Sequence, residues 1–338
     1  MSKRILILHT GGTISMVESQ QGYVPSENFP ARLHDQLQHQ NIGGTELPVY
    51  NLLETEHLID SSNSTPNDWV AIADLLSEHW HKFDGFVVLH GTDTMAYTAS
   101  ALSFILGKID KPVIVTGSQI PLVKVRNDAL SNLVISLTLA ANYDIPEVCI
   151  YFNGKLIRGN RSTKLKSMQL DAFHSPNFPD LAVVGIDVDL QQDLLYKASK
   201  PNFKTYQFDA QAVAIVPMYP GVPSSVIDAV LSNKRIKALI IQTYGVGNPP
   251  DANKALMKRL AKANKDGVVV VNLSQCLMGG VFQGSYATGE SLNKIGIVGG
   301  ADLTLEAAFT KLHYLLACGY DSEEIKQLVP TSLRGECR

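Results

Sequence analysis

The sequence predicts an α/β protein with a larger N-terminal parallel-sheet domain and a smaller C-terminal α/β domain. Short β-branched or aromatic runs alternate with segments of helical periodicity, a pattern typical of parallel strands joined by crossover helices. The chain has 338 residues, more than the roughly 150 residues of a typical domain, and two hydrophobic cores are therefore expected. We expect an N-terminal domain over residues 1–190, a linker over 191–211 and a C-terminal domain over 212–338.

Four short apolar runs in the first half are expected to form buried strands: residues 5–8, 86–89, 113–116 and 148–152. Three helices are expected between these strands. Thr65 and Pro66 open the first helix as N-cap and first-turn proline, and apolar residues follow at helical spacing as far as Leu76. The second helix begins after Thr94, and the third covers 127–141. This order of elements is that of a parallel sheet with crossover connections.

Residues 15–30 do not follow this pattern. Gly22, Pro25 and polar side chains dominate there, around the lone aromatic Tyr23, and the segment is expected to be a hairpin or a mobile loop. A second alternation of elements follows the linker. Its strands are expected over 213–216, 238–242 and 268–272, and its helices over 224–233, 252–265 and 302–317.

Composition and charge argue against several classes of protein. Hydrophobic residues make up 45% and charged residues 18%, with a formal net charge of −3, which is ordinary for a globular enzyme and unlike a nucleic-acid-binding surface. No run approaches the ~20 apolar residues of a membrane span. A strand that starts by Ile5 leaves no room for a signal peptide, and a cytoplasmic location is expected. The cysteines lack metal or redox spacing and are expected to be free, buried thiols: Cys149, Cys276, Cys318 and Cys337.

Two threonine-containing motifs directly follow expected strands. Thr10-Gly11-Gly12-Thr13-Ile14 comes after the first strand, and His90-Gly91-Thr92-Asp93-Thr94 comes after the second. Ligands of open α/β sheets bind at the carboxyl ends of the strands, and both hydroxyl clusters are therefore expected to line one crevice. A threonine beside a second threonine and an aspartate is suited to attack on a carbonyl carbon, provided that an adjacent base activates its hydroxyl.

Each candidate residue also has a purely structural interpretation. Thr13 could cap the backbone of a glycine turn before a hairpin, because glycine permits tight turns. Asp93 could cap the helix that follows it. Lys164 lies in the cationic run 158–166, which would suit a solvated basic loop. The residues alone leave both kinds of interpretation open.

The two motifs resemble the two signature segments of the L-asparaginase/glutaminase family of amidohydrolases. Three further segments fit that family in the right order: Asp60-Ser61-Ser62, Thr116-Gly117-Ser118-Gln119 and Arg161-Ser162-Thr163-Lys164. The resemblance covers nearly the whole chain. The segments Tyr244-Gly245-Val246-Gly247-Asn248 and Val298-Gly299-Gly300-Ala301-Asp302 are most similar to the bacterial cytoplasmic type I branch.

The resemblance implies hydrolysis of L-asparagine to L-aspartate and ammonia through an acyl-threonine intermediate. It makes Thr13 the nucleophile that attacks the side-chain amide carbon. Thr92, Asp93 and Lys164 would form a hydrogen-bonded set that handles protons, and a desolvated lysine can act as a base because burial readily shifts its pKa. Tyr23 would be the loop tyrosine that closes near the nucleophile.

The resemblance also implies how the substrate is held and how subunits assemble. The implied substrate-binding residues are Asp60, Ser61, Ser62, Thr92, Asp93 and Asn248. The first three would hold the α-carboxylate and α-amino group, and Asp93 would bind the α-ammonium. Asn248 resembles a residue that is lent to the neighbouring subunit's site, which implies a homodimer or homotetramer. Neither a cofactor nor a metal is implied.

Cytoplasmic relatives can bind a second asparagine at a subunit interface and so become cooperative. The residues that match this regulatory site are Thr163, Gln242, Ser274 and Cys276. The cooperative pattern has an arginine where this chain has Gln242. A neutral amide holds a carboxylate less strongly than a guanidinium with two charge-assisted hydrogen bonds, and weak or absent cooperativity is therefore expected.

Other functions share part of the pattern. A glutaminase-asparaginase would use the same chemistry, as would an amidotransferase subunit that supplies ammonia. The amidotransferase would be expected to carry an extra docking domain, for which 338 residues leave little room. A non-catalytic amino-acid sensor would keep the pocket, but it would have no need of the intact reactive residues.

Several weaker signals do not indicate a further site. The G-x-G-x-x-G spacing of a dinucleotide site is absent. His79 and His81 would face different ways on a helix, and a metal site is not expected there. His90 is expected to be a satisfied interior histidine.

Overall fold

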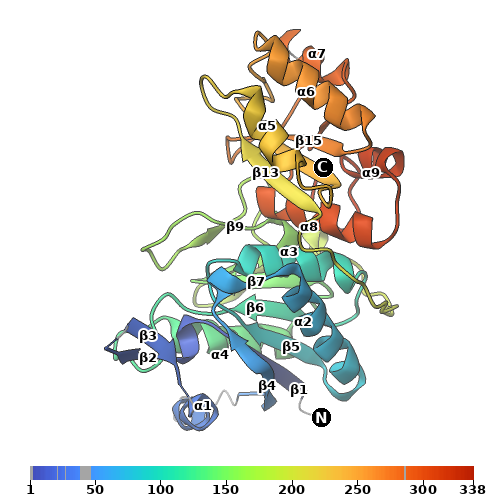
Figure 1. Ribbon diagram of the computed structural model, residues 1–338. Helices are drawn as coiled ribbons and strands as arrows, with labels where there is room; N and C mark the ends of the chain where they lie inside the picture. The colour runs from blue at the N-terminus through green and yellow to red at the C-terminus, as the bar shows by residue number, and fades with distance from the viewer. Residues whose placement is uncertain (1–2, 21, 27, 39–46, 285–286) are drawn as a thin grey trace. The chain divides into compact units, whose positions relative to one another are not determined.

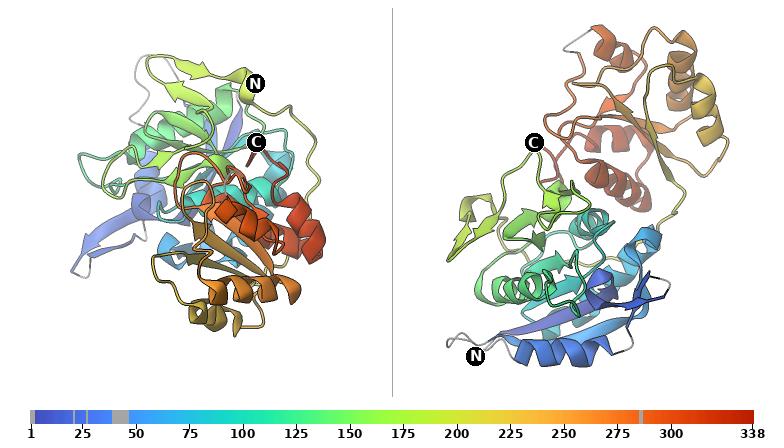
Figure 2. Two further views of the ribbon diagram at one scale, coloured as in Figure 1. Left: turned by 90° about the horizontal axis from the view of Figure 1, so that it is seen from above. Right: turned by 90° about the vertical axis from the view of Figure 1, so that its left-hand side faces the viewer.

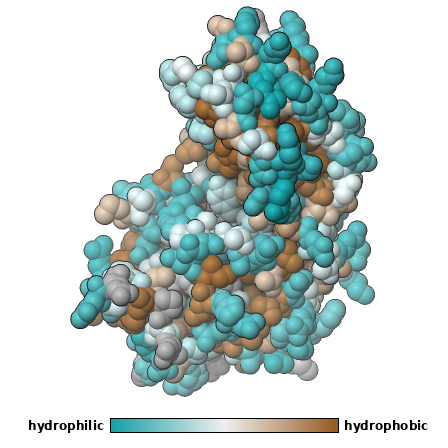
Figure 3. All heavy atoms as spheres, in the orientation of Figure 1, coloured by the Kyte–Doolittle hydropathy of each residue, from teal (hydrophilic) through white to brown (hydrophobic). Residues whose placement is uncertain are grey.

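The computed structural model describes residues 3–20, 22–26, 28–38, 47–284 and 287–338. The chain divides into two compact units, Met1–Thr205 and Tyr206–Arg338, and both are α/β as predicted (Figure 1). In the described ranges, no helix is long and apolar enough to cross a membrane. The face drawn in Figure 3 mixes hydrophilic and hydrophobic side chains, in keeping with the ordinary composition of the chain.

The N-terminal unit is built on an eight-stranded sheet in the order β12-β11-β8-β7-β6-β5-β1-β4. Five neighbouring strands of this sheet run parallel: β7 (Val148–Phe152), β6 (Val113–Thr116), β5 (Gly85–Leu89), β1 (Arg4–Gly11) and β4 (Val49–Ile59). The four predicted strands lie here and are buried, as expected for a parallel sheet that is covered on both faces. The predicted fold class is confirmed.

The other edge of the sheet is antiparallel, which the strand pattern did not predict. β7 turns directly into β8 (Lys155–Arg158), and β11 (Ala182–Val184) and β12 (Val188–Leu190) continue the edge. Asn153 and Gly154 join β7 to β8 with φ angles of 46° and 83°. A two-residue hairpin turn requires such a left-handed pair, and Asn-Gly between apolar runs is its sequence signal.

Helices cover both faces of the parallel strands (Figure 1). α1 (Phe29–Gln38) and α4 (Ala129–Asn142) share one core cluster with the alternate residues Ile5 and Ile7 of β1. α2 (Pro66–His79) and α3 (Met95–Ile105) pack against each other on the opposite face, and Figure 2 shows these layers from two further sides. α2 begins as predicted, with Thr65 as its N-cap and Pro66 in its first turn.

Two elements between residues 29 and 59 were not predicted, α1 and β4. β4 is an edge strand whose side chains are exposed or half-buried, and it lacks the continuous apolar run of the inner strands. The preceding segment 15–30 contains the hairpin of β2 (Met16–Ser19) and β3 (Gly22–Pro25), which was one of its two predicted forms.

The C-terminal unit contains a four-stranded parallel sheet of β13 (Val213–Pro217), β14 (Ala238–Thr243), β15 (Val269–Ser274) and β16 (Val298–Gly299). One face packs against α8 (Leu305–Ala317) and α9 (Ser322–Leu328), and the other against α5 (Ser224–Leu231) and α6 (Lys254–Lys265). α7 (Ala287–Asn293) precedes β16. Val269 and Val271 enter one core and Val270 the other, as the two-residue period of a strand requires.

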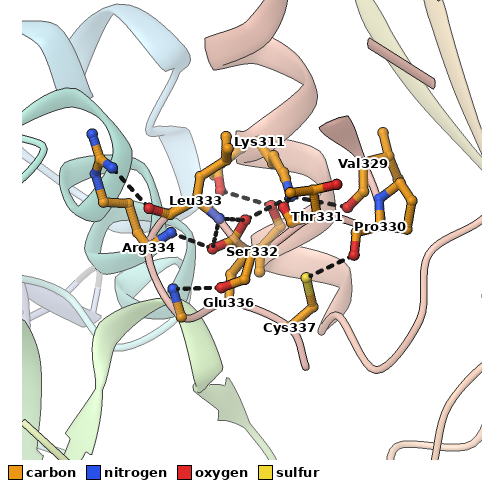
Figure 4. A network of polar contacts seen from close by, with 12 residues as sticks. Lys311, Val329, Pro330, Thr331, Ser332, Leu333, Arg334, Glu336 and Cys337 are labelled. Atoms are coloured by element: carbon orange, nitrogen blue, oxygen red, sulfur yellow. Dashed lines mark hydrogen bonds and ion pairs between the residues drawn. The ribbon is translucent and has the colours of Figure 1, made fainter. Parts of the chain in front are cut away.

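A buried ion pair ties the end of the chain to α8 (Figure 4). Lys311 Nζ lies 2.6 Å from Glu336 Oε1 and donates to the carbonyls of Val329 and Thr331 at 2.9 and 2.6 Å. The Glu336 carboxylate also accepts from backbone N–H groups of the preceding turn. Both side chains are almost fully buried. Removal of either partner would leave an uncompensated buried charge and destabilise the fold by about 3–5 kcal/mol. These contacts therefore fix the conformation of the C-terminal segment.

Part of the predicted linker is held by the N-terminal unit. The Leu194 carbonyl accepts from Arg158 Nη2 at 2.6 Å, and the Tyr196 N–H donates to Glu147 at 3.1 Å. The first residues after the predicted boundary at 190 are therefore ordered by contacts with this unit.

The exposure of the cysteines differs from the expectation. None of the four forms a disulfide with another described residue, but only Cys149 and Cys337 are buried, whereas Cys276 and Cys318 are exposed. The expectation of burial was wrong for the latter two because Cys276 lies in the loop after β15 and Cys318 ends α8.

Candidate active site

The carboxyl ends of β1 and β5 bring the two threonine motifs together. The two strands are parallel neighbours, and the motifs leave the sheet side by side. A Cβ atom added to Gly12 would lie 2.4 Å from the Gly91 nitrogen, and Gly12 has a φ of 92°. Only glycine fits such a position, because the two backbones touch. Thr13 and Thr92 each come directly after one of these two glycines, so the two threonines start from neighbouring positions.

Thr13 begins a 3-10 turn, Thr13–Ser15, where β1 ends. Ser15 holds this turn, because its N–H and its hydroxyl both donate to the Gly12 carbonyl, at 3.2 and 3.0 Å. Ile14 is buried beneath the turn. The Thr13 side chain is half-buried, and none of the described residues hydrogen-bonds to its hydroxyl. The predicted nucleophile is thus carried by a fixed turn with its hydroxyl unengaged by that part of the chain.

Lys164 joins two residues of the second motif. Its Nζ lies 2.8 Å from Thr92 Oγ1 and 2.6 Å from Asp93 Oδ1. Lys164 comes from β9 (Thr163–Lys164), which pairs with β10 (Phe173–His174). Its side chain is 19% exposed, whereas that of Asp93 is 60% exposed. The three residues form one hydrogen-bonded cluster that opens to solvent at Asp93.

The structural interpretations do not describe the contacts of Asp93 and Lys164. Thr94 is the N-cap of α3, and no side-chain hydrogen bond caps this helix. The run around Lys164 is not a solvated loop, since Arg158 is buried and its Nε lies 2.6 Å from Glu147 Oε2. Both residues are instead engaged with each other.

The turn Asp60-Ser61-Ser62 is anchored to the second motif. The buried Ser61 hydroxyl accepts from the Asp93 N–H at 3.2 Å, and the Ser61 carbonyl accepts from the Thr94 hydroxyl at 2.8 Å. The Asp60 carboxylate accepts from the N–H and the hydroxyl of Ser62, at 3.1 and 3.0 Å. The predicted substrate-binding turn therefore lies directly beside Asp93.

Tyr23 lies on β3 of the hairpin that follows Thr13, and its side chain is 47% exposed. Lys124 Nζ lies 5.8 Å from the Tyr23 ring centroid and 2.5 Å from Glu18 Oε2, on the strand opposite. Within the described residues, no hydrogen bond joins Tyr23 to Thr13. Closure of the hairpin over the nucleophile stays a prediction.

His90 is a satisfied interior histidine, as expected. Its Nδ1 lies 2.7 Å from the Gly91 carbonyl oxygen and its Nε2 lies 2.9 Å from Thr98 Oγ1. Burial lowers the pKa of His90, which favours the neutral ring. Among the described residues, no group of His, Cys, Asp and Glu side chains could hold a metal ion.

Three of the predicted regulatory residues belong to the C-terminal unit. Gln242 lies on β14, and Ser274 ends the neighbouring β15. The Ser274 hydroxyl donates to the Gly245 carbonyl at 2.6 Å and accepts from the Cys276 N–H at 2.9 Å. These residues therefore lie at or near the carboxyl ends of two adjacent strands.

Asn248 closes a tight turn in the same unit. It exchanges backbone hydrogen bonds with Tyr244, and its Oδ1 accepts from the Thr288 hydroxyl at 2.9 Å. The fourth predicted regulatory residue, Thr163, belongs to the N-terminal unit. It is buried and lies opposite His174 in the β9–β10 pair.

Gln119 is a polar residue at the cluster that the sequence did not single out. It follows β6, and its Oε1 lies 3.2 Å from Thr92 Oγ1. Its Nε2 donates to the carbonyls of Ser167 and Gln169, at 3.1 Å each. The available signal was a family-like segment at the carboxyl end of the third predicted strand. That position indicates the crevice, but not the contacts of the amide.

Comparisons with known proteins identify the family of this chain. Residues 4–196 match the family model described as asparaginase, N-terminal, and residues 212–329 match the glutaminase/asparaginase C-terminal domain. L-asparaginase 1 of Escherichia coli strain K12 is 46% identical over 99% of this chain and 98% of its own. L-asparaginase I of Vibrio cholerae has a crystal structure with a TM-score of 0.90, 44% identity and 100% coverage of both chains. A probable cytoplasmic L-asparaginase of Campylobacter jejuni has a TM-score of 0.76 and 26% identity, covering 97% of this chain and 99% of its own. The chain therefore belongs to the asparaginase family of amidohydrolases and contains both of its domains.

Proposed function

We propose that the protein is an L-asparaginase that hydrolyses L-asparagine to L-aspartate and ammonia through an acyl-threonine intermediate. The observation that carries this proposal is the Lys164–Thr92–Asp93 cluster beside the turn of Thr13. The 46% identity to E. coli L-asparaginase 1 over nearly the whole chain supports the same activity. Neither a cofactor nor a metal takes part in the proposed reaction.

In the proposed reaction, the Thr13 oxygen attacks the side-chain amide carbon of the substrate. A new C–O bond forms, the Thr13 proton passes to the leaving nitrogen through the cluster, and the C–N bond breaks to release ammonia. A water then attacks the ester carbon, which frees aspartate and returns the proton to Thr13. A threonine hydroxyl needs an adjacent proton acceptor for such an attack, and the amine of Lys164, held in place by its hydrogen bond to Thr92, is suited to that role.

The two charged ends of the substrate would be held on one side of the cluster. Asp93 has an exposed carboxylate, which suits the α-ammonium group. Asp60, Ser61 and Ser62 would hold the α-carboxylate and α-amino group, and the hydrogen bond from the Asp93 N–H to Ser61 Oγ supports a shared site. Tyr23 would close over the nucleophile once the substrate is bound.

We further propose that the protein acts as a cytoplasmic homodimer or homotetramer in which Asn248 contributes to a neighbouring subunit's site. We also propose that the chain consists of a catalytic domain over 1–190, a linker over 191–211 and a C-terminal domain over 212–338. Family membership supports the assembly, and the similarity to a probable cytoplasmic L-asparaginase supports the location.

Ammonia release tests this function directly. The purified protein is incubated separately with L-asparagine and L-glutamine, and Thr13→Ala serves as the inactive counterpart. We expect ammonia from asparagine at a rate that Thr13→Ala lowers by several orders of magnitude, with the fold intact. Absence of ammonia from asparagine with the wild-type protein would overturn the proposed function.

A further inference from the structure

The backbone at Gln119 is fixed by a buried carboxylate. The N–H groups of Gln119 and Ile120 donate to Asp128 Oδ2 and Oδ1, at 3.0 and 2.9 Å. Asp128 is 6% exposed and also accepts from Asn132 Nδ2 at 3.2 Å. Two backbone N–H groups and one side-chain amide therefore hold this carboxylate. The carboxylate in turn fixes the backbone from which the Gln119 side chain extends.

The orientation of the Gln119 amide follows from its neighbours. The carbonyls of Ser167 and Gln169 can only accept, so the group that faces them must be the NH₂ group. The amide oxygen is then directed to Thr92 Oγ1, 3.2 Å away. Because an amide oxygen only accepts, the Thr92 hydroxyl must be the donor in this contact.

The Thr92 hydroxyl therefore donates its single proton in a hydrogen bond to Gln119 Oε1. The 2.8 Å contact between Lys164 Nζ and Thr92 Oγ1 is then a hydrogen bond that the lysine donates to a lone pair of Thr92. The remaining lone pair is free to accept a hydrogen bond from a third partner. Without Gln119, the hydroxyl could rotate and offer its proton to Lys164 or to solvent.

We propose that Gln119 is a positioning residue for the reaction, which orients the Thr92 hydroxyl so that its oxygen faces Lys164 and the reacting groups as an acceptor. The inference rests on the proposed asparaginase function. It extends the cluster by one residue, whose proposed role is exerted through Thr92.

A purely structural role for Gln119 makes a different prediction. In that case the important contacts would be those to Ser167 and Gln169, which brace the segment after Lys164. Gln119→Glu separates the two roles, because a carboxylate still accepts from Thr92 but cannot donate to the two carbonyls and is repelled by them. Gln119→Met keeps a similar length and loses both functions.

The experiment measures kcat and KM for asparagine in the two variants. We expect Gln119→Met to lower kcat about ten-fold with KM nearly unchanged, the order of one lost hydrogen bond. We expect Gln119→Glu to recover much of that loss. Gln191→Met is the matched control and should behave as wild type. Gln191 is exposed, and among the described residues its side chain bonds only to Asp189. If kcat of Gln119→Glu is no higher than that of Gln119→Met, the role of Gln119 is purely structural and the proposal is overturned.

A double-mutant cycle with Thr92→Val adds an independent test. If Gln119 acts through the Thr92 hydroxyl, Gln119→Met should have almost no further effect in the Thr92→Val background. An equal loss in both backgrounds would overturn the proposal. Should Thr92→Val turn over too slowly, the order of the Glu and Met variants decides. Ammonia release by the wild-type protein distinguishes failure of the proposed function from failure of this inference. A wild-type protein that is inactive on asparagine would contradict the proposed function. An active wild-type protein together with a Gln119→Met variant of unchanged kcat would contradict only this inference.

Discussion

Replacing Gly12 with alanine tests whether the contact between the two motif backbones places the nucleophile. The added Cβ would lie 2.4 Å from the Gly91 nitrogen and 2.5 Å from its Cα. Ordinary contacts of this kind are at least about 1 Å longer, and both atoms belong to backbone that cannot rotate away. The turn of Thr13 would have to shift by a comparable amount. A misplacement of about 1 Å can cost roughly 10²-fold in rate, and we expect a fall of that order in kcat.

Gly267→Ala is the matched control for this change. Gly267 has a φ of 87°, close to the 92° of Gly12, but an added Cβ would have no atom within 4 Å. Both variants therefore carry similar backbone strain of about 1–3 kcal/mol, and only Gly12→Ala carries the steric clash. Steady-state ammonia release and thermal unfolding are measured for both. A Gly12→Ala protein with wild-type kcat would refute the argument that this contact sets the nucleophile's position.

Three further outcomes follow from the site. Lys164→Met keeps the length of the side chain and removes the amine, and it should reduce kcat by several orders of magnitude; near-normal turnover would remove Lys164 from the proton-handling set. The kcat/KM for glutamine should be at least roughly 10²-fold lower than that for asparagine. One added methylene displaces the side-chain amide while the α-ammonium and α-carboxylate groups of the substrate stay bound. Comparable kcat/KM values for the two substrates would indicate a glutaminase-asparaginase. Rates should follow a hyperbola in asparagine, because Gln242 lacks the charge of an arginine and effector binding is expected to be about 1–3 kcal/mol weaker, or roughly 5- to 150-fold. A sigmoidal curve that is abolished by changing Gln242 or Cys276 would contradict this last expectation.

The inner strands were predictable because burial on both faces leaves a continuous apolar run. The runs at 86–89 and 113–116 lie inside the observed strands for this reason. β4 escaped prediction because an edge strand is only half covered, and its sequence mixes Glu54 and Glu56 with apolar residues. The antiparallel hairpin after β7 had a signal in Asn153-Gly154 that a search for helix crossovers overlooks.

The site was predictable as a set of residues but not as a set of contacts. Thr92 and Lys164 are 72 positions apart in sequence, and only the family resemblance linked them before the 2.8 Å contact was known. The role proposed for Gln119 depends on carbonyls 48 and 50 positions further along the chain, whose direction is set by the backbone path after β9. Carbonyl orientation leaves no mark in residue types, so this contact requires a structure.

The most direct test of the central claim is the location of the acyl group. The protein is mixed with asparagine, quenched in acid during turnover, digested and mapped by mass spectrometry, with a slowly deacylating variant used if the intermediate is too short-lived. We predict an aspartyl adduct on Thr13, in the peptide that follows β1. An adduct on Thr92 instead would contradict the assignment of the nucleophile.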